Sequence, residues 1–213
     1  MSSPVIVLGG GGHAKVLMET LQQQSQVVLG FTSTDVQTAG RDVLGIPALG
    51  TDDDLLARFA PAEVVLVNGV GSVGLPDVRT HLYQKFVATG YRFLPVIHSS
   101  AVVSPTASVG EGTQVLAGAV VQTEARIGQN VIINTKASID HDSVIADHVH
   151  IAPGVTVCGG VRIGEGCHIG AGATIVQGVE IGRDSIVGAG TLVLGDVPPG
   201  SLIMGVPGRR VIK

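Results

Sequence analysis

The most regular feature of the chain is a six-residue repeat of aliphatic positions in its C-terminal part. Stepping by six from Ile97 to Val193 gives seventeen positions, and every one of them is Ile or Val. Four residues after each stands a small or β-branched residue, from Ala101 to Val197. A period of six fits neither an amphipathic helix nor a simple array of hairpins. It predicts short strands separated by tight corners and repeated along one axis.

These repeats predict a parallel β-helix with three short faces per coil. Eighteen residues complete one coil, so residues i and i+18 lie about 4.8 Å apart along the axis. The aliphatic position points inward on each face, and the small residue fills the corner beside it. Seventeen repeats make between five and six coils. We assign residues 96–213 to this β-helix and its C-terminal tail.

The first 95 residues follow a different pattern, in which apolar strands alternate with helices. This alternation predicts a small, Rossmann-like parallel sheet with crossover helices. The boundary falls near Pro95 and separates a first domain, 1–95, from the β-helix. The predicted strands are 5–8, 27–31 and 63–68, and the predicted helices are 13–24, 52–59 and 76–89.

Four glycines directly follow the first predicted strand. The run from Gly9 to Gly12, before His13, lets a ligand approach the backbone and turns helix N–H groups toward an anion. A dinucleotide site would usually carry an acidic residue where the second strand ends, but here the strand ends in Phe31-Thr32-Ser33-Thr34, and Asp35 comes only further on. A tight turn without a ligand is the plain alternative. We favour binding of the phosphates of a nucleotide-linked sugar, with a second loop at 68–72 (Asn-Gly-Val-Gly-Ser) at the same sheet edge.

His141 is the candidate catalytic residue of the β-helix. It is the third residue of its repeat, so it faces outward near a corner, and Gly159 stands eighteen residues later in the next coil. A glycine there leaves room for a ligand against the backbone. An imidazole with a pKa near neutrality can take a proton from an attacking amine, and an adjacent carboxylate, Asp140 or Asp142, can orient it. An exposed turn histidine without a function is the alternative.

The other histidines and the two cysteines leave further hypotheses open. Three more histidines follow closely in the repeat: His148, His150 and His168. They leave two hypotheses open, a zinc site and a contact with an acyl group. We expect no metal. Cys158 and Cys167 are interpreted as structural residues, with a covalent acyl-cysteine as the alternative.

Composition narrows the class of protein. Hydrophobic residues make up 45% of the chain and charged residues 14%, so a large apolar core is expected. The net charge of −4 gives no reason to expect nucleic acid or an anionic membrane as a partner. We predict a cytoplasmic protein from three features of the sequence. It has only two cysteines, its start is unlike a signal peptide, and it has no apolar run long enough to span a membrane.

Together these motifs resemble one family, the sialic-acid O-acetyltransferases and nucleotide-aminosugar N-acetyltransferases with hexapeptide repeats. The resemblance covers nearly the whole chain, and the loop at 67–72 is most similar to that of the GDP-perosamine N-acetyltransferases. The motifs that carry it are Gly9-Gly10-Gly11-Gly12-His13, Asn134-Thr135, Asp140-His141-Asp142, the run 148–154 (His-Val-His-Ile-Ala-Pro-Gly) and Met204-Gly205-Val206-Pro207-Gly208-Arg209.

The resemblance implies a left-handed β-helix and a role for individual residues. His141 would be the general base, and Asp142 would be its orienting partner. The acyl donor acetyl-CoA would contact His150, Gly159, Ala171, Ala189 and Arg209. The sugar nucleotide would bind at Gly10, Gly11, Gly12, His13, Thr32, Gly69 and Asn134.

The implied function is acetyl-CoA-dependent N-acetylation of the C-4 amine of a nucleotide-linked 4-amino-4,6-dideoxy sugar. GDP-perosamine is the favoured substrate, and surface polysaccharide synthesis is the favoured context. The resemblance also implies a homotrimer with CoA between adjacent β-helices. Open alternatives are a UDP-linked sugar, O-acetylation of a sialic acid, a metal-dependent enzyme like the γ-carbonic anhydrases, and a non-catalytic sugar-nucleotide scaffold.

Overall fold

The computed structural model describes residues 3–33 and 42–211, which form two compact units. The first comprises Met1–Gly71 and Val78–Val96, and the second comprises Ser72–Asp77 and Ile97–Lys213, in each case within the described residues. The short segment Ser72–Asp77 therefore belongs with the β-helix, although it lies within the predicted first domain. The division into a sugar-nucleotide domain, 1–95, and an acetyltransferase domain, 96–213, stays a prediction.

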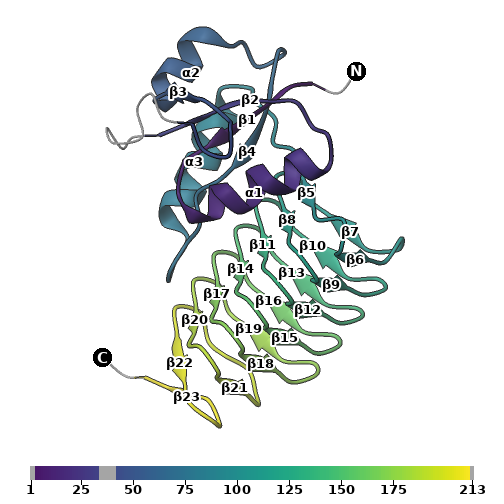
Figure 1. Ribbon diagram of the computed structural model, residues 1–213. Helices are drawn as coiled ribbons and strands as arrows, with labels where there is room; N and C mark the ends of the chain where they lie inside the picture. The colour runs from purple at the N-terminus through teal and green to yellow at the C-terminus, as the bar shows by residue number, and fades with distance from the viewer. Residues whose placement is uncertain (1–2, 34–41, 212–213) are drawn as a thin grey trace. The chain divides into compact units, whose positions relative to one another are not determined.

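A four-stranded parallel sheet forms the centre of the first unit, in the order β3-β2-β1-β4 (Figure 1). The predicted alternation of strands and helices is confirmed. The sequence pattern does not predict β3, because its three residues are few and none is β-branched. The elements are β1 (Val5–Leu8), α1 (Gly12–Gln23), β2 (Val28–Thr32), β3 (Ala48–Gly50), α2 (Asp52–Arg58), β4 (Val65–Asn68) and α3 (Asp77–Ala88).

Strand β1 lies inside this sheet because all four of its side chains are apolar. Val5, Ile6, Val7 and Leu8 are completely buried, and β1 pairs with β2 on one side and with β4 on the other. Burial on both faces is typical of a parallel strand that is covered by helices. Since β1 and β4 are neighbours, the loops that follow them meet at the carboxyl edge of the sheet.

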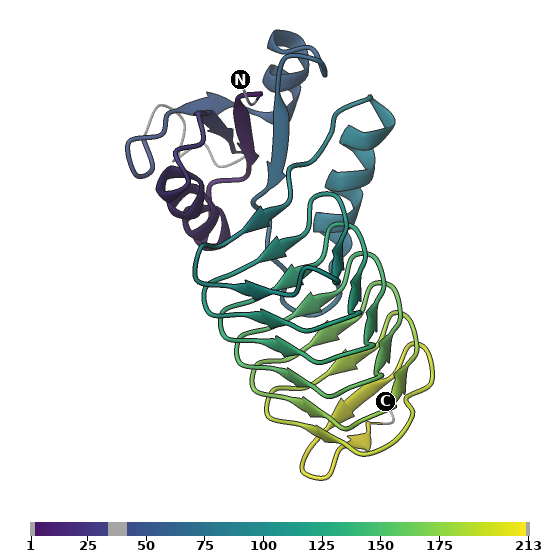
Figure 2. The same ribbon diagram turned by 90° about the vertical axis from the view of Figure 1, so that its right-hand side faces the viewer.

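The second unit is a parallel β-helix whose coils are stacked along one axis (Figure 2). Its three sheets are parallel throughout, except that the last strand, β23, pairs with β22 in the antiparallel direction. The first sheet holds β7 (Ser108–Val109), β10 (Arg126–Ile127), β13 (Val144–Ile145), β16 (Arg162–Ile163) and β19 (Glu180–Ile181); the second holds β5 (Val96–Ile97), β8 (Gln114–Val115), β11 (Ile132–Ile133), β14 (His150–Ile151), β17 (His168–Ile169), β20 (Ile186–Val187), β22 (Leu202–Met204) and β23 (Arg209–Arg210); the third holds β6 (Val102–Val103), β9 (Val120–Val121), β12 (Ser138–Ile139), β15 (Thr156–Val157), β18 (Thr174–Ile175) and β21 (Leu192–Val193).

The predicted register of eighteen residues is confirmed by the strand pairs. Ile133 pairs with Ile151, and Ile151 pairs with Ile169. The inward aliphatic residues and the small corner residues form one continuous buried core. The first coil departs from the prediction, since Ile97 is 36% exposed and Val103 is only partly buried. Its strands are at the ends of their sheets, so they have a coil stacked on one side only.

The corners of the β-helix share a backbone conformation that recurs every six residues. From Gly112 to Gly190, each corner contains one residue with a positive φ between 53° and 75°. Glycine adopts this left-handed conformation without strain, and Asn and Asp tolerate it better than other residues do. Eight of the fourteen corner positions are glycine, and the others include Asn130, Asp142 and His148. Asp142 is thus fixed at a corner by the repeat itself.

Candidate functional site

The candidate site in the β-helix centres on a hydrogen-bonded pair, His141 and Asp142. Nδ1 of His141 lies 2.7 Å from Oδ2 of Asp142. The pair forms although the two residues are adjacent in the chain, because the left-handed backbone at Asp142, with a φ of 60°, turns its carboxylate back toward the ring. Asp140 faces elsewhere and accepts a hydrogen bond from the backbone N–H of His141 at 2.8 Å. The partner expected from the family resemblance, Asp142, is therefore the one in contact with the ring.

The electrostatic surroundings of His141 suit a general base. The hydrogen bond to Asp142 raises the pKa of His141, and the nearby charges of Asp140 and Asp142 raise it further. Because a carboxylate can only accept, Nδ1 carries the hydrogen in the neutral ring, and Nε2 of that neutral form has the lone pair. The side chain is 49% exposed, so Nε2 can be reached by a substrate.

The His141 ring lies directly on the backbone of Gly159 in the next coil. A Cβ atom at position 159 would be 2.6 Å from both Cε1 and Nε2 of the ring. The backbone N–H of Gly160 donates to the carbonyl oxygen of His141 at 2.8 Å, which ties the two corners together. The structure thus brings His141, Asp142 and Gly159 into contact at neighbouring corners of the β-helix, and their catalytic roles stay predictions.

His150 is hydrogen-bonded to two residues of the protein itself, Ser72 and Asn134. Its Nδ1 lies 3.1 Å from the carbonyl oxygen of Ser72 and 2.9 Å from the Ser72 hydroxyl, and its Nε2 lies 3.2 Å from Nδ2 of Asn134. Because a carbonyl can only accept, Nδ1 donates, and Nε2 accepts from the Asn134 amide. The ring is 7% exposed. The predicted contacts of His150 with acetyl-CoA and of Asn134 with the substrate stay predictions.

Ser72 is a residue of this cluster that the sequence does not reveal. It is 78 positions away from His150, and no spacing rule connects a loop after a strand to a face of the β-helix. The one feature of the sequence that points to Ser72 is its place at the end of the loop at 68–72, where the sequence predicts a ligand site. The contact explains why Ser72–Asp77 belongs to the second unit.

His148, His168 and Cys167 have structural surroundings, and Nδ1 of His148 lies 3.0 Å from Nδ2 of Asn130. The ring of His168 packs edge-on against that of His150 at 4.9 Å, and burial lowers the pKa of His168. Burial raises the pKa of Cys167 to about 11, and its Sγ donates to the carbonyl oxygen of Gly182. Within residues 3–33 and 42–211, no three His, Cys, Asp or Glu side chains are grouped so as to hold a metal ion. No helix in the same ranges is long and apolar enough to cross a membrane.

In the first unit, the glycine loop leads into the exposed N-terminus of α1. Gly9 has a φ of 95°, and its N–H donates to the carbonyl oxygen of Thr32 at 3.0 Å. Gly10 must lack a side chain, because a Cβ there would be 2.7 Å from the ring of Phe31. A Cβ at Gly11 or Gly12 would meet only open space. These two glycines therefore leave the backbone accessible where α1 begins.

No side chain caps α1, and its first turn contains no acidic residue. The N–H groups at the start of a helix have no acceptor within the helix, and they favour an anion. The loop residues 69–71 lie beside this helix start. A Cβ at Gly69 would be 2.7 Å from the carbonyl oxygen of Leu8, and one at Gly71 would be 3.3 Å from Cβ of His13. The predicted residues Gly10 to His13 and Gly69 are thus at one edge of the sheet, where its order reverses between β1 and β4.

Asp52 is a second residue that sequence reasoning missed. The Thr32 hydroxyl, at the carboxyl end of β2, donates to Oδ1 of Asp52 at 2.6 Å. The sequence shows no acidic residue directly after β2, yet this carboxylate is at that strand end because α2 begins there. In the sequence, the aspartates at the start of α2 could be recognised only as the signal of a helix N-terminus.

The residues predicted to line the acyl-donor groove lie at successive corners and at the C-terminal hairpin. Ala171 and Ala189 are both exposed and are eighteen residues apart. The carbonyl oxygen of Ala171 accepts from the N–H of Gly190 at 2.8 Å. Arg209 is exposed on β23. No interaction in the structure joins these three residues to His141, so their assignment stays a prediction.

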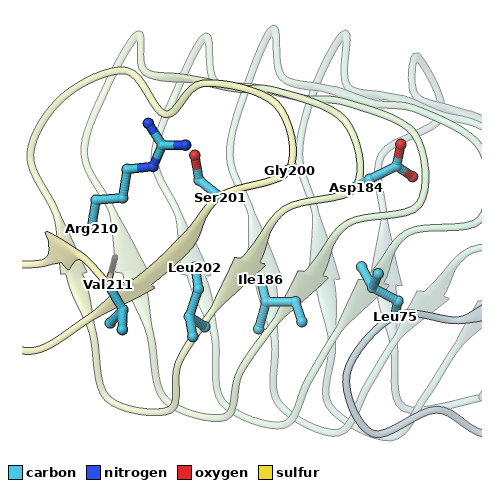
Figure 3. A pocket seen from close by; sticks show the side chains of 8 residues that line it. All are labelled: Leu75, Asp184, Ile186, Gly200, Ser201, Leu202, Arg210 and Val211. Carbon is cyan, nitrogen blue, oxygen red and sulfur yellow. The ribbon is translucent and has the colours of Figure 1, made fainter. Parts of the chain in front are cut away.

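A cavity of about 580 Å³ lies on the second unit, away from these corners (Figure 3). Four apolar side chains lie along one side of it in Figure 3, and Arg210, Ser201 and Asp184 lie along the other. None of the predicted site residues lines this cavity. Its lining is Leu75, Asp184, Ile186, Gly200, Ser201, Leu202, Arg210 and Val211.

Comparison with known proteins gives matches to both parts of the chain. Residues 4–86 match the family of the PglD N-terminal domain, and residues 124–159 and 160–195 match the bacterial transferase hexapeptide family. A solved mutant of perosamine N-acetyltransferase from Caulobacter crescentus, in complex with CoA and GDP-perosamine, is 36% identical with a TM-score of 0.91. The similarity covers 100% of this chain and 99% of that one. The chain belongs to the nucleotide-aminosugar N-acetyltransferase family of hexapeptide acyltransferases.

Two further relatives support this family membership. The acetyltransferase domain of PglB from Neisseria gonorrhoeae FA1090, in complex with acetyl coenzyme A, is 33% identical with a TM-score of 0.89, and covers 99% of this chain and 100% of that one. UDP-N-acetylbacillosamine N-acetyltransferase of Bacillus subtilis (strain 168) is 37% identical over 117 residues, or 53% of this chain. The chain matches 51% of the length of that curated relative. The predicted family and the left-handed β-helix fold are confirmed.

Proposed function

We propose that the chain is an acetyl-CoA-dependent N-acetyltransferase that acts on the C-4 amine of a nucleotide-linked 4-amino-4,6-dideoxy sugar. The observation that carries this proposal is the His141–Asp142 pair lying on the bare backbone of Gly159. GDP-perosamine is the favoured substrate, because the Caulobacter relative that matches along its whole length is solved with that sugar nucleotide.

In the proposed mechanism, the sugar amine attacks the thioester carbonyl carbon of acetyl-CoA directly. A C–N bond forms, and the surplus proton on nitrogen passes to Nε2 of His141, either directly or through a water. The C–S bond then breaks and the CoA thiolate leaves, after which the imidazolium can return the proton to the thiolate. Asp142 stabilises the imidazolium while it carries the proton.

The tetrahedral intermediate needs a hydrogen-bond donor for its oxyanion. The N–H of Gly160 is already bonded to the carbonyl oxygen of His141, so we assign this task to the N–H of Gly159. The pantetheine arm would run along the exposed small residues Ala171 and Ala189, with Arg209 beyond them. His150 would reach the acetyl group only after a change in its bonds to Ser72 and Asn134.

The sugar nucleotide would lie with its diphosphate at the uncapped N-terminus of α1, on Gly10 to His13. Gly69 would line the site from the neighbouring loop, and the Thr32–Asp52 pair is at the strand end where a ribose or base can bind. Asn134 stays proposed as a substrate-binding residue. We further propose a homotrimer with CoA bound between subunits, in the cytoplasm, where both free thiols stay reduced.

A thiol-release assay tests this function. Purified protein is given acetyl-CoA with GDP-perosamine, a UDP-linked 4-amino sugar or a sialic acid, and free CoA is measured. We expect release with an amino-sugar nucleotide and its loss in His141→Asn. Release without dependence on any of these acceptors, or an unchanged rate in His141→Asn at every pH, would rule the proposal out.

A UDP-linked sugar is the second candidate substrate, and a specific observation favours it. The curated relative from Bacillus subtilis is named for a UDP-linked amino sugar, and it is 37% identical over the aligned residues. The same assay decides between the two carriers, because kcat/KM is compared for GDP- and UDP-linked forms of one amino sugar.

A further inference from the structure

Arg79, in the first turn of α3, is the largest fully buried side chain in the part of the chain that the structure describes. It is 1% exposed. Arginine is almost never fully buried without specific bonding partners, because burying its charge is costly. Burial lowers the pKa of Arg79 to about 9, so the guanidinium still carries its charge at neutral pH.

Two hydrogen bonds of Arg79 reach the end of β4 and the loop that follows it. Its Nη1 donates to the carbonyl oxygen of Asn68 and to that of Val70, each at 2.8 Å. In return, Nδ2 of Asn68 donates to the backbone carbonyl oxygen of Arg79 at 3.0 Å. The side-chain oxygen of Asn68 also accepts from the N–H of Val70 at 3.2 Å. The start of α3 and the loop are therefore joined by reciprocal bonds, with the guanidinium on the buried side.

These bonds fix the direction in which the next peptide group points. The peptide between Val70 and Gly71 is trans, so its C=O and N–H point to opposite sides. Since the carbonyl oxygen of Val70 is held by Arg79, the N–H of Gly71 is directed away from Arg79. Gly71 lies against His13, because a Cβ at position 71 would be 3.3 Å from Cβ of His13. Gly71 itself is thus next to the first turn of α1.

We propose that Arg79 is a positioning residue for diphosphate binding, which holds the loop at 68–71 so that the N–H of Gly71 joins the N–H groups at the start of α1. This inference rests on the proposed function, because the anion is the diphosphate of the sugar nucleotide. Arg79 does not touch the ligand. Its buried positive charge also favours an anion in the adjacent loop, since such charges are poorly screened by solvent.

A purely structural role for Arg79 predicts a different outcome for two substitutions. Arg79→Met keeps most of the volume and removes both the charge and the donors. Arg79→Lys keeps the charge, and its ammonium can donate to both carbonyl oxygens, because a single nitrogen of Arg79 makes both bonds. If the side chain only fills space, the two variants should bind nucleotide equally well.

The test is calorimetric titration of the whole chain with GDP and with UDP, for wild type, Arg79→Met and Arg79→Lys. Arg58→Met is the matched control, because Arg58 also donates to a backbone carbonyl of the first unit, that of Leu49, but from an exposed position. We expect Arg79→Met to weaken nucleotide binding at least tenfold and Arg79→Lys to lie between it and wild type. Arg58→Met should bind as wild type does, and the KM for acetyl-CoA should be unchanged in all three.

The outcomes separate the inference from the function on which it rests. Wild-type affinity in Arg79→Met, or equal losses in Arg79→Met and Arg79→Lys, overturns the positioning role while the proposed function stands. If wild type binds neither GDP nor UDP, the proposed function fails and the inference falls with it. Circular dichroism checks that each variant is folded. Should Arg79→Met unfold, the comparison of nucleotide dissociation constants between Arg79→Lys and wild type decides. An unchanged dissociation constant in Arg79→Lys would then overturn the inference.

Discussion

Replacing Gly159 by alanine perturbs the proposed base without altering any group that reacts. The added Cβ would lie 2.6 Å from Cε1 and Nε2 of His141, whereas carbon atoms in contact are about 3.5–4.0 Å apart. The ring must therefore move by about 1 Å, which its flexible side chain allows. The backbone at Gly159 has no positive φ, so alanine is not strained there. We expect Gly159→Ala to fold and to unfold at a temperature no lower than wild type.

The loss of activity can be estimated from this displacement. A misplacement of about 1 Å in a reacting group lowers the rate about 100-fold, which corresponds to about 2.7 kcal/mol in activation free energy. This is within the contribution of about 10²- to 10⁴-fold that a general base makes. The displacement also weakens the 2.7 Å hydrogen bond to Asp142, the main cause of the raised pKa of His141.

The assay is steady-state CoA release with the amino-sugar nucleotide that wild type uses, measured across pH. The base must be neutral to act, so the acidic limb of the kcat/KM profile reports the pKa of His141. We expect kcat to fall about 100-fold and this limb to move to lower pH in Gly159→Ala. Gly195→Ala is the control, because Gly195 lies 36 residues further along the same corner column and a Cβ there meets nothing within 4 Å.

The reasoning would be refuted by a Gly159→Ala enzyme with wild-type kcat and a wild-type pH profile. A rise in the KM for acetyl-CoA with unchanged kcat would likewise refute it, since the glycine would then only give the coenzyme space. Equal losses in Gly159→Ala and Gly195→Ala would show that the effect comes from the corner column and not from the ring.

Three further predictions concern Asp142, the corners and the cysteines. Asp142→Asn keeps a residue that tolerates the left-handed backbone but removes the charge that raises the pKa of His141. We therefore expect kcat to fall at least about tenfold and the acidic limb of the pH profile to move to lower pH. An acidic limb that does not move would contradict the pairing of His141 with Asp142. Glu124 has a φ of 58°, so Glu124→Gly should raise the free energy of unfolding by at most about 1–2 kcal/mol and Glu124→Val should lower it. Denaturant titration measures both, and the opposite order would contradict the corner assignment. Titration of the native protein with a thiol reagent should modify the half-buried Cys158 and leave Cys167, whose pKa burial raises to about 11, until the chain is unfolded; two equally fast thiols would disagree with the structure.

The β-helix could be predicted from sequence because its core depends on local spacing. Each coil repeats the same inward positions every six residues, so a run such as Ile133, Ile139 and Ile145 reports the fold directly. The adjacent residues His141 and Asp142 could be paired for the same reason. The conformation that lets them meet, a positive φ at every sixth residue, is visible in the sequence only as the frequent glycines at the corners.

The contacts that the sequence did not reveal join residues with no periodic relation. Ser72 and His150 are 78 positions apart, and Asp52 reaches Thr32 only because α2 begins at the end of a strand that the pattern did not predict, β3. Arg79 reads in sequence as an ordinary surface residue near the start of a helix. Its burial depends on the path of the loop at 68–71, and local propensities do not determine that path.

The repetition of the corners has a consequence for how this protein can change length. Every coil contains the same three turns, and the reactive pair needs only its own turn and the one directly beyond it, at Gly160. Eighteen residues inserted or removed near Val193 would lengthen or shorten the column while each remaining strand still found a partner in register. The His141–Asp142 contact is in that sense independent of how tall the column is, whereas the proposed acyl-donor groove along Ala171, Ala189 and Arg209 would change with it.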